Sequence, residues 1–118
     1  MARMTIAQLR EREVIRLATY KNQEPTENDI NEARAIMNSF YRLCGLCETL
    51  LYWENDERTY NKYYTREAEA KRDRWDDRLK SKLKPYGLTL YYSGYCPSIG
   101  TKDAHGGCSE KITRWFYQ

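Results

Sequence analysis

The sequence predicts an α+β fold: an N-terminal helix, a long antiparallel α-helical hairpin, and a C-terminal two-stranded β-hairpin with a long loop. Apolar residues recur at helical spacing up to about residue 84, where Pro85 and Gly87 interrupt the pattern. From Leu88 onward apolar and polar residues alternate, which is typical of a half-buried strand. With 118 residues the chain is expected to form a single domain, 1–118.

The composition predicts a folded chain with many aromatic residues. Leu, Ile, Val and Phe supply only 19 residues, but the net charge is +3, and 11 Tyr and 3 Trp add apolar area. Disorder requires few apolar residues together with a high net charge, so we expect a folded domain. No apolar run exceeds four residues, which excludes a transmembrane helix. The first residues carry no apolar signal segment, so the expected location is the cytoplasm.

The first helix is predicted at about residues 5–20. Thr5 and Gln8 have the spacing of a capping box, in which each side chain bonds the other residue's backbone amide. A polar segment that ends in Pro25 follows, and we interpret it as the connection to the next helix.

The second helix is predicted at about residues 26–53, with Thr26 as its cap. Its apolar residues form a heptad seam with spacings of 3 and 4: Ile30, Ala33, Met37, Phe40, Cys44, Cys47 and Leu51. A flanking column widens this face: Ile36, Leu43 and Leu50. Such a seam packs against another long helix, either within one chain or in a homodimer, so both a monomer and a homodimer remain open.

The third helix is predicted at about residues 57–84 and ends there because proline at 85 cannot continue it. Its apolar stripe consists of Tyr60, Tyr64, Ala68, Trp75, Leu79 and Leu83. Two strands, at about 88–95 and 110–117, are predicted to follow. Pairing Leu88 with Phe116, and Tyr92 with Ile112, places the apolar side chains of both strands on one face.

The charges differ from one helix to the next. Residues 25–56 carry 2 basic and 6 acidic side chains, whereas residues 57–84 carry 10 basic and 6 acidic ones. One interpretation is that the two helices pair and their charges complement each other. The other is that the third helix binds nucleic acid through Arg66, Arg74, Arg78, Lys80, Lys82 and Lys84. Against the second interpretation, Asp73, Asp76 and Asp77 lie among these cations in sequence.

Four cysteines and the single histidine offer a candidate zinc site: Cys44, Cys47, Cys96, His105 and Cys108. The spacing matches zinc motifs poorly, and the first two cysteines lie on the apolar seam, so we interpret those two as core residues. Cys96 and Cys108 would face each other across the predicted hairpin, as thiols or as a disulfide. We expect no cofactor, with zinc as the alternative.

The loop Gly94–Ser109 is long and rich in glycine, and such loops are either functional or merely mobile. Cys96, Asp103, His105 and Cys108 contain the parts of a thiol nucleophile with a base. A cysteine and a histidine this close in sequence are common by chance, so we expect that the protein is not an enzyme.

Aromatic residues in the predicted β-hairpin suggest a protein-binding surface: Tyr91, Tyr95, Trp115 and Tyr117. Tyrosine and tryptophan are enriched where proteins bind each other, and they also stack on unpaired bases. The alternative is that these rings form the core of a chain that is poor in leucine and valine.

Three functions follow from the sequence. The first is a small non-enzymatic protein-interaction module that binds a cellular or host protein. Its size and lack of a catalytic constellation are typical of phage or mobile-element accessory proteins, including anti-CRISPR inhibitors of host defence, but this is an analogy of character alone. The second is a nucleic-acid-binding protein that uses the third helix and exposed tyrosines. The third is a small zinc-dependent or thiol-dependent enzyme.

Overall fold

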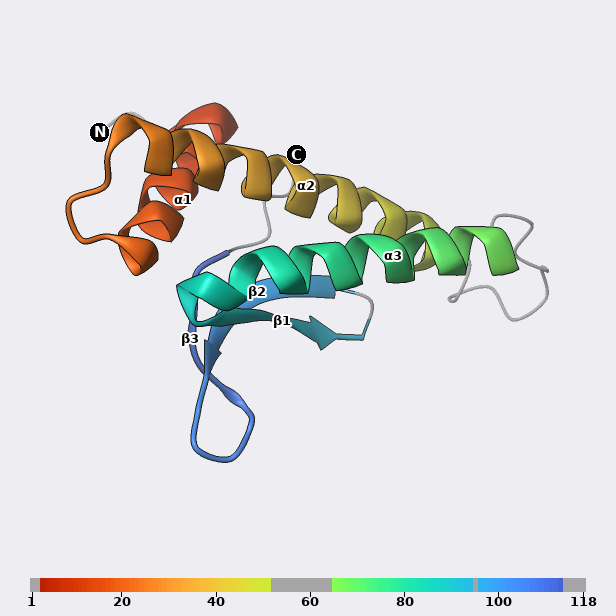
Figure 1. The fold of residues 1–118 in the computed structure, drawn as a ribbon. Helices are drawn as coiled ribbons and strands as arrows, with labels where there is room; N and C mark the ends of the chain where they lie inside the picture. The colour runs from red at the N-terminus through yellow and green to blue at the C-terminus, as the bar shows by residue number, and fades with distance from the viewer. Residues whose placement is uncertain (1–2, 52–64, 95, 114–118) are drawn as a thin grey trace.

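A computed structural model of the chain describes residues 3–51, 65–94 and 96–113. These residues form three helices and a three-stranded antiparallel sheet, so the expected α+β class is confirmed (Figure 1). The elements are α1 (Ile6–Lys21), α2 (Glu27–Leu51), α3 (Arg66–Leu83), the short 3₁₀ helix η1 (Lys84–Tyr86), β1 (Leu88–Ser93), β2 (Cys96–Lys102) and β3 (Cys108–Lys111).

Both predicted helix caps at the N-terminal end of the chain are present. The Thr5 hydroxyl accepts from the Gln8 amide at 3.1 Å, and the Gln8 side chain accepts from the Thr5 amide at 2.8 Å. At α2, Thr26 and Asp29 form the same reciprocal pair, at 3.0 and 3.2 Å. These bonds satisfy amides that the first turn of a helix cannot pair internally, and they therefore determine where α1 and α2 begin.

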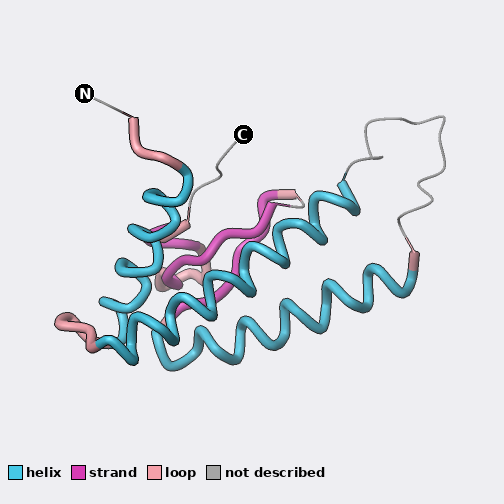
Figure 2. The backbone as a smooth tube through the Cα atoms, turned by 90° about the horizontal axis from the view of Figure 1, so that it is seen from above, coloured by secondary structure: helices cyan, strands magenta, loops and turns pink. Residues whose placement is uncertain are grey.

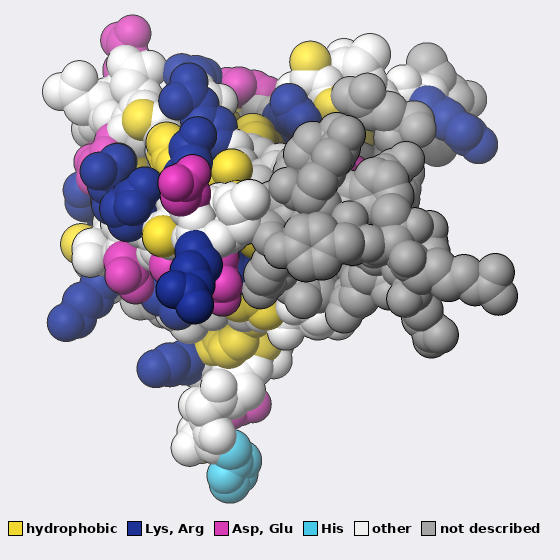
Figure 3. Space-filling model, turned by 90° about the vertical axis from the view of Figure 1, so that its right-hand side faces the viewer, with side chains coloured by type: hydrophobic (Ala, Val, Ile, Leu, Met, Phe, Trp, Pro, Cys, Tyr) yellow, Lys and Arg dark blue, Asp and Glu magenta, His cyan; other side chains and the backbone are white. Residues whose placement is uncertain are grey.

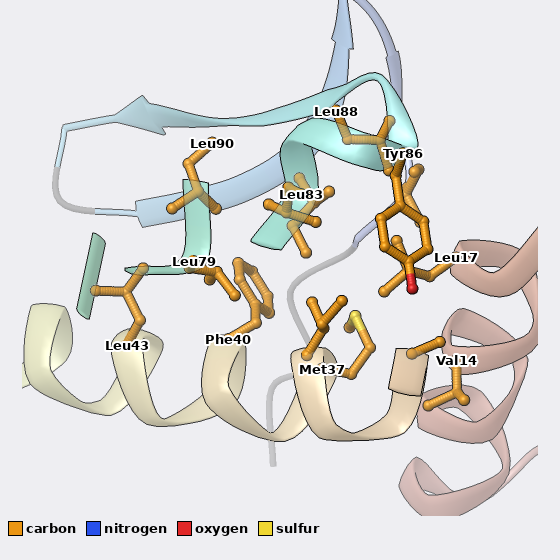
Figure 4. Close-up of a cluster of buried hydrophobic side chains, with 14 of the residues drawn as sticks. Val14, Leu17, Met37, Phe40, Leu43, Leu79, Leu83, Tyr86, Leu88 and Leu90 are labelled. Atoms are coloured by element: carbon orange, nitrogen blue, oxygen red, sulfur yellow. The ribbon is translucent and has the colours of Figure 1, made fainter. Parts of the chain in front are cut away.

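Four residues of the apolar seam of α2 are buried within this one chain: Ala33, Met37, Phe40 and Cys47 are at most 3% exposed. Ile30 and Cys44 are half-buried and pack against the same cluster. The flanking column, Ile36, Leu43 and Leu50, is as buried as the first four residues, so the buried face of α2 is wider than a two-position coiled-coil seam. Side chains from α1, α3 and the sheet cover it, as Figure 4 shows for part of the cluster. A homodimer through this seam would have to displace elements of the same chain.

The third helix begins later than the sequence predicted. Thr65 has an extended backbone, and its hydroxyl accepts from the Ala68 amide at 3.0 Å, so it caps a helix that starts at Arg66 rather than at about residue 57. Tyr60 and Tyr64, the first two residues of the expected stripe, lie outside the described residues. At the other end the chain continues into η1, and Gly87, at φ 71°, adopts the left-handed conformation that glycine favours.

The predicted two-stranded pairing is wrong. The loop expected at Gly94–Ser109 contains β2, which is the middle strand of the sheet. Leu88 therefore faces Thr101, and Tyr92 faces Pro97 rather than Ile112. The last strand, expected at about 110–117, is β3, which pairs with β2 and not with β1. Phe116, the expected partner of Leu88, lies outside the described residues.

The sheet packs against the helices, and α2 and α3 lie side by side and run in opposite directions (Figure 2). Leu88 and Leu90 of β1, with Ile99 of β2, point into the same cluster as Leu79 and Leu83 of α3. The core thus lies between the helix pair and the sheet, with α1 covering one end (Figure 4). Within the described part of the chain, no helix is both long and apolar enough to cross a membrane.

Candidate functional site

The six cations predicted to bind nucleic acid are all exposed, but they do not share one side of the helix. Arg66 and Lys84 are each nine residues from Trp75, or two and a half helical turns, so they lie on the side of α3 opposite to Trp75. Arg74, Arg78 and Lys82 follow one another at intervals of one helical turn and form a stripe along α3, and Arg78 and Lys82 of this stripe lie beside Ser39 of α2. We call these three residues the basic stripe.

The acidic residues of α3 that argued against nucleic-acid binding lie away from Trp75, although Asp77 is three residues from Arg74 and neighbours that end of the basic stripe. Asp73 and Asp77 are each two residues from Trp75, which places them about 200° around the helix from it. Asp76 points toward the sheet, where it accepts a hydrogen bond from the Tyr92 hydroxyl. Helical geometry therefore separates charges that are neighbours in the sequence.

Ion pairs add to this separation. Lys80 pairs with Asp76 at 3.0 Å, and Arg72 pairs with Asp73 at 3.0 Å. The three residues of the basic stripe, by contrast, form no ion pair with another residue in the described ranges. The acidic side chains thus neutralise the sheet side of α3, and an uncompensated positive charge remains along its border with α2.

A small pocket lies at this border. It has a volume of about 130 Å³ and is lined by Ser39 of α2 and by Trp75, Arg78, Leu79 and Lys82 of α3. The guanidinium of Arg42, from the next turn of α2, lies 5.8 Å from the centre of the Trp75 ring. We call Ser39, Arg42, Trp75, Arg78 and Lys82 together the α2–α3 groove.

The groove combines groups that recognise different parts of a nucleotide. Two cations and a hydroxyl can bind a phosphate, and a half-buried indole with a neighbouring guanidinium offers flat surfaces for stacking. The sequence alone identifies Arg78 and Lys82 as candidates, but not Ser39, Arg42 or Trp75. Ser39 and Arg42 belong to a helix whose charge is acidic overall, and Trp75 fitted the core stripe. Only the packing of α2 against α3 brings them together.

The β2–β3 hairpin projects away from the helices, with the histidine near its end (Figure 3). A carboxylate oxygen of Asp103 accepts from the His105 amide at 2.8 Å and from the Gly107 amide at 2.7 Å. The Tyr91 hydroxyl donates to the Gly107 carbonyl at 3.0 Å, so β1 also supports the turn. The other aromatic residues predicted to bind protein, Tyr95, Trp115 and Tyr117, lie outside the described residues.

The candidate zinc ligands are not gathered into one site. Cys44 and Cys47 are part of the core, whereas His105 is exposed at the end of the projecting hairpin. Within the described ranges, no three histidine, cysteine or acidic residues are arranged to hold a metal ion. Burial raises the pKa of the Cys44 thiol to about 12 and that of Cys47 to about 11, and a thiol that stays protonated is a poor ligand and a poor nucleophile.

The expected pairing of Cys96 with Cys108 is wrong. Cys96 faces Ser93 in β1, and Cys108 faces Lys102 at the far end of β2, so the two lie at opposite ends of the middle strand. All four cysteines are free thiols. The carboxylate of Asp103 holds the hairpin turn rather than a catalytic histidine.

No protein-family model, curated protein or solved structure matches this chain.

Proposed function

We propose that this protein is a non-enzymatic nucleic-acid-binding protein, and that it contacts the phosphate backbone through the α2–α3 groove. The observation that carries the proposal is the basic stripe: two of its cations, Arg78 and Lys82, line a pocket, and none of the three forms an ion pair in the described ranges. Unpaired cations next to an aromatic ring are typical of surfaces that follow a nucleic-acid backbone. The sequence pI of about 8.6 is consistent with attraction to a polyanion.

Binding should depend on salt in a predictable way. Arg42, Arg74, Arg78 and Lys82 offer four phosphate contacts. Each contact contributes about −0.7 to −0.9 to the slope of log K against log salt, so the slope should be about −3. We would measure fluorescence anisotropy of labelled single- and double-stranded DNA and RNA over a salt series. Flat traces with all four probes, from protein shown to be folded, would contradict the proposal.

A pair of matched variants separates the groove from net charge. R78E/K82E reverses two groove cations, and R66E/K84E reverses two exposed cations away from the groove, at the first residue of α3 and the first of η1, with the same change in net charge. We expect R78E/K82E to bind at least tenfold more weakly, with a slope of log K against log salt that is shallower by about 1.5. The affinity and the slope of R66E/K84E should stay close to those of the wild type. Equal losses in both variants would mean that net charge, and not the groove, is responsible.

We propose protein interaction as the second candidate function, in which the protein inhibits a host factor such as a CRISPR effector. The observation that favours it is the projecting β2–β3 hairpin, whose turn is held in one shape by Asp103. A preordered hairpin loses little conformational entropy when it binds a partner. The test is a pull-down from bacterial lysate with wild type and with A104E/H105E. A partner captured equally by both would not be bound through the hairpin.

A further inference from the structure

The size of the pocket in the α2–α3 groove limits what it can hold. At about 130 Å³ it is well below the 300–1,000 Å³ that is usual for small-molecule sites. It therefore suits one group of a larger ligand, such as a single base or a single phosphate, rather than a whole cofactor. Its lining of one indole, one hydroxyl and two cations indicates a ligand that has both a flat face and negative charge.

The packing of α2 against α3 argues against a duplex as this ligand. The major groove of DNA is about 12 Å wide and admits one helix, which with its side chains is about 10–12 Å across. Helices packed side by side have axes about 8–10 Å apart, so the pair is too wide to enter. Arg78 and Lys82 share a pocket with Ser39 of α2, and α2 lies along α3 (Figure 2). A major groove that received these two cations on α3 would therefore have to admit α2 as well.

Trp75 is a second argument against a duplex as the ligand. A base can stack on an indole only when it is free of its own base-paired stack, as in single strands and loops. Trp75 is half-buried, and Arg42, Arg78 and Lys82 surround it with positive charge. The flat apolar ring is suited to stack on an unpaired base, and the cations around it are suited to bind the phosphates on either side of that base.

We infer that the ligand is single-stranded nucleic acid, with one unpaired base seated against Trp75 and the adjoining phosphates at Arg78 and Lys82. This inference rests on the proposed function and adds the class of nucleic acid to it. Since each base has a flat face, binding in this manner discriminates little between sequences.

The test compares three labelled oligonucleotides of the same length: a mixed-sequence single strand, its duplex, and a backbone of abasic sites. We expect the single strand to bind about tenfold more tightly than either of the others, because stacking of one base accounts for about that factor. A duplex that binds as tightly as the single strand would overturn the inference, and so would an abasic strand that does. Absence of binding to all three would instead overturn the proposed function.

Variants of the pocket connect this preference to its residues. W75L should abolish the difference between the normal and the abasic strand. Because Trp75 also packs against the core, circular dichroism must show that the variant folds. S39E provides an independent test, since it adds a carboxylate to the pocket from a half-buried position, and N38E places the same charge at the exposed neighbouring residue. We expect S39E to lose at least tenfold in single-strand affinity and N38E less than threefold. Equal effects would overturn the assignment of the pocket.

Discussion

The hydroxyl of Tyr92 donates a 2.5 Å hydrogen bond to a carboxylate oxygen of Asp76 and thereby joins β1 to α3. The Asp76 side chain is only 14% exposed and also pairs with Lys80. Both partners hold this carboxylate on the sheet side of the helix. The bond therefore has two consequences: it attaches the sheet to the helix pair, and it keeps a negative charge away from the α2–α3 groove.

Removal of this hydroxyl should destabilise the fold. We expect Y92F to lower the free energy of unfolding by about 1–2 kcal/mol, because it leaves a largely buried carboxylate with one partner fewer. Urea titration followed by circular dichroism measures the change. The control is Y91F, which removes the hydroxyl that donates to Gly107 in the exposed hairpin and should cost less than about 1 kcal/mol. A Y92F cost no larger than that of Y91F would contradict the structural role of the bond.

Gly100 lies where β3 crosses close to β2. A Cβ atom at this position would lie 2.6 Å from the Glu110 carbonyl oxygen and would collide with the Cys108 sulfur. We therefore expect G100A to destabilise the protein by about 1–3 kcal/mol, because the strands must separate to accept the methyl group. Thermal unfolding would measure this loss.

Gly45 provides the matched control for that substitution. It lies inside α2, where no described atom is within 4 Å of an added Cβ. G45A should raise the stability by about 0.5–1 kcal/mol, because alanine favours the helix and restricts the unfolded chain. If G100A were as stable as G45A, the result would contradict the close contact between β2 and β3 at Gly100.

The helices were predictable because the signals for them are local. The reciprocal bonds at Thr5–Gln8 and Thr26–Asp29 are formed by residues three apart in the sequence. The buried face of α2 likewise follows from its own spacing. The start of α3 at Arg66 was missed because the tyrosines before it continue the apolar period and conceal the cap at Thr65.

The sheet was not predictable to the same degree. Pro97 and Gly100 weaken the strand signal of β2, and both are residues that strands usually disfavour. Within the described residues, β3 pairs with β2 only from Gly100 onward, and Pro97 lies outside that pairing, where a missing amide donor costs the ladder no hydrogen bond to β3. Gly100 is required by the close approach of β3.

The candidate site could be predicted only in part. The sequence identified an excess of cations on the third helix, and helical geometry alone could have placed Arg78 and Lys82 on the side of Trp75, away from Asp73 and Asp77. The contribution of Ser39 and Arg42 could not be foreseen, because it depends on the register of α2 against α3. That register results from tertiary packing of the core rather than from any local pattern.

The turn of the β2–β3 hairpin should depend on a single carboxylate. D103A removes the acceptor for the amides of His105 and Gly107. We expect amide exchange at these two residues to increase about tenfold, with a change in global stability below about 1 kcal/mol, because the hairpin lies away from the core. Hydrogen exchange followed by NMR measures both. D103N keeps an acceptor oxygen and should retain most of the protection. Equal protection in D103A and wild type would contradict the role of Asp103.

Stability should decline at alkaline pH because of buried thiols. Burial raises the pKa of Cys47 from its ordinary value of 9.0 to about 11, and that of Cys44 to about 12. Below pH 9 both thiols are protonated in the folded and unfolded states, so their burial carries no ionisation penalty. Above pH 9 the unfolded state gains free energy by ionising them, whereas the folded state keeps them neutral. Stability therefore falls as the pH rises from 9 toward 11.

We expect a loss of about 1 kcal/mol or more between pH 9 and pH 10, measured by urea titration in the presence of a reducing agent. C44A/C47A lacks both groups and should show a flatter profile over this interval, whatever its absolute stability. Buried tyrosines act in the same direction from their ordinary value of about 10 upward, since burial raises the pKa of Tyr86 from 10.0 to about 12, and C44A/C47A retains this contribution. A profile between pH 9 and 10 that is equally steep in wild type and in C44A/C47A would show that these thiols titrate alike in both states, and so that they are not buried in the native protein.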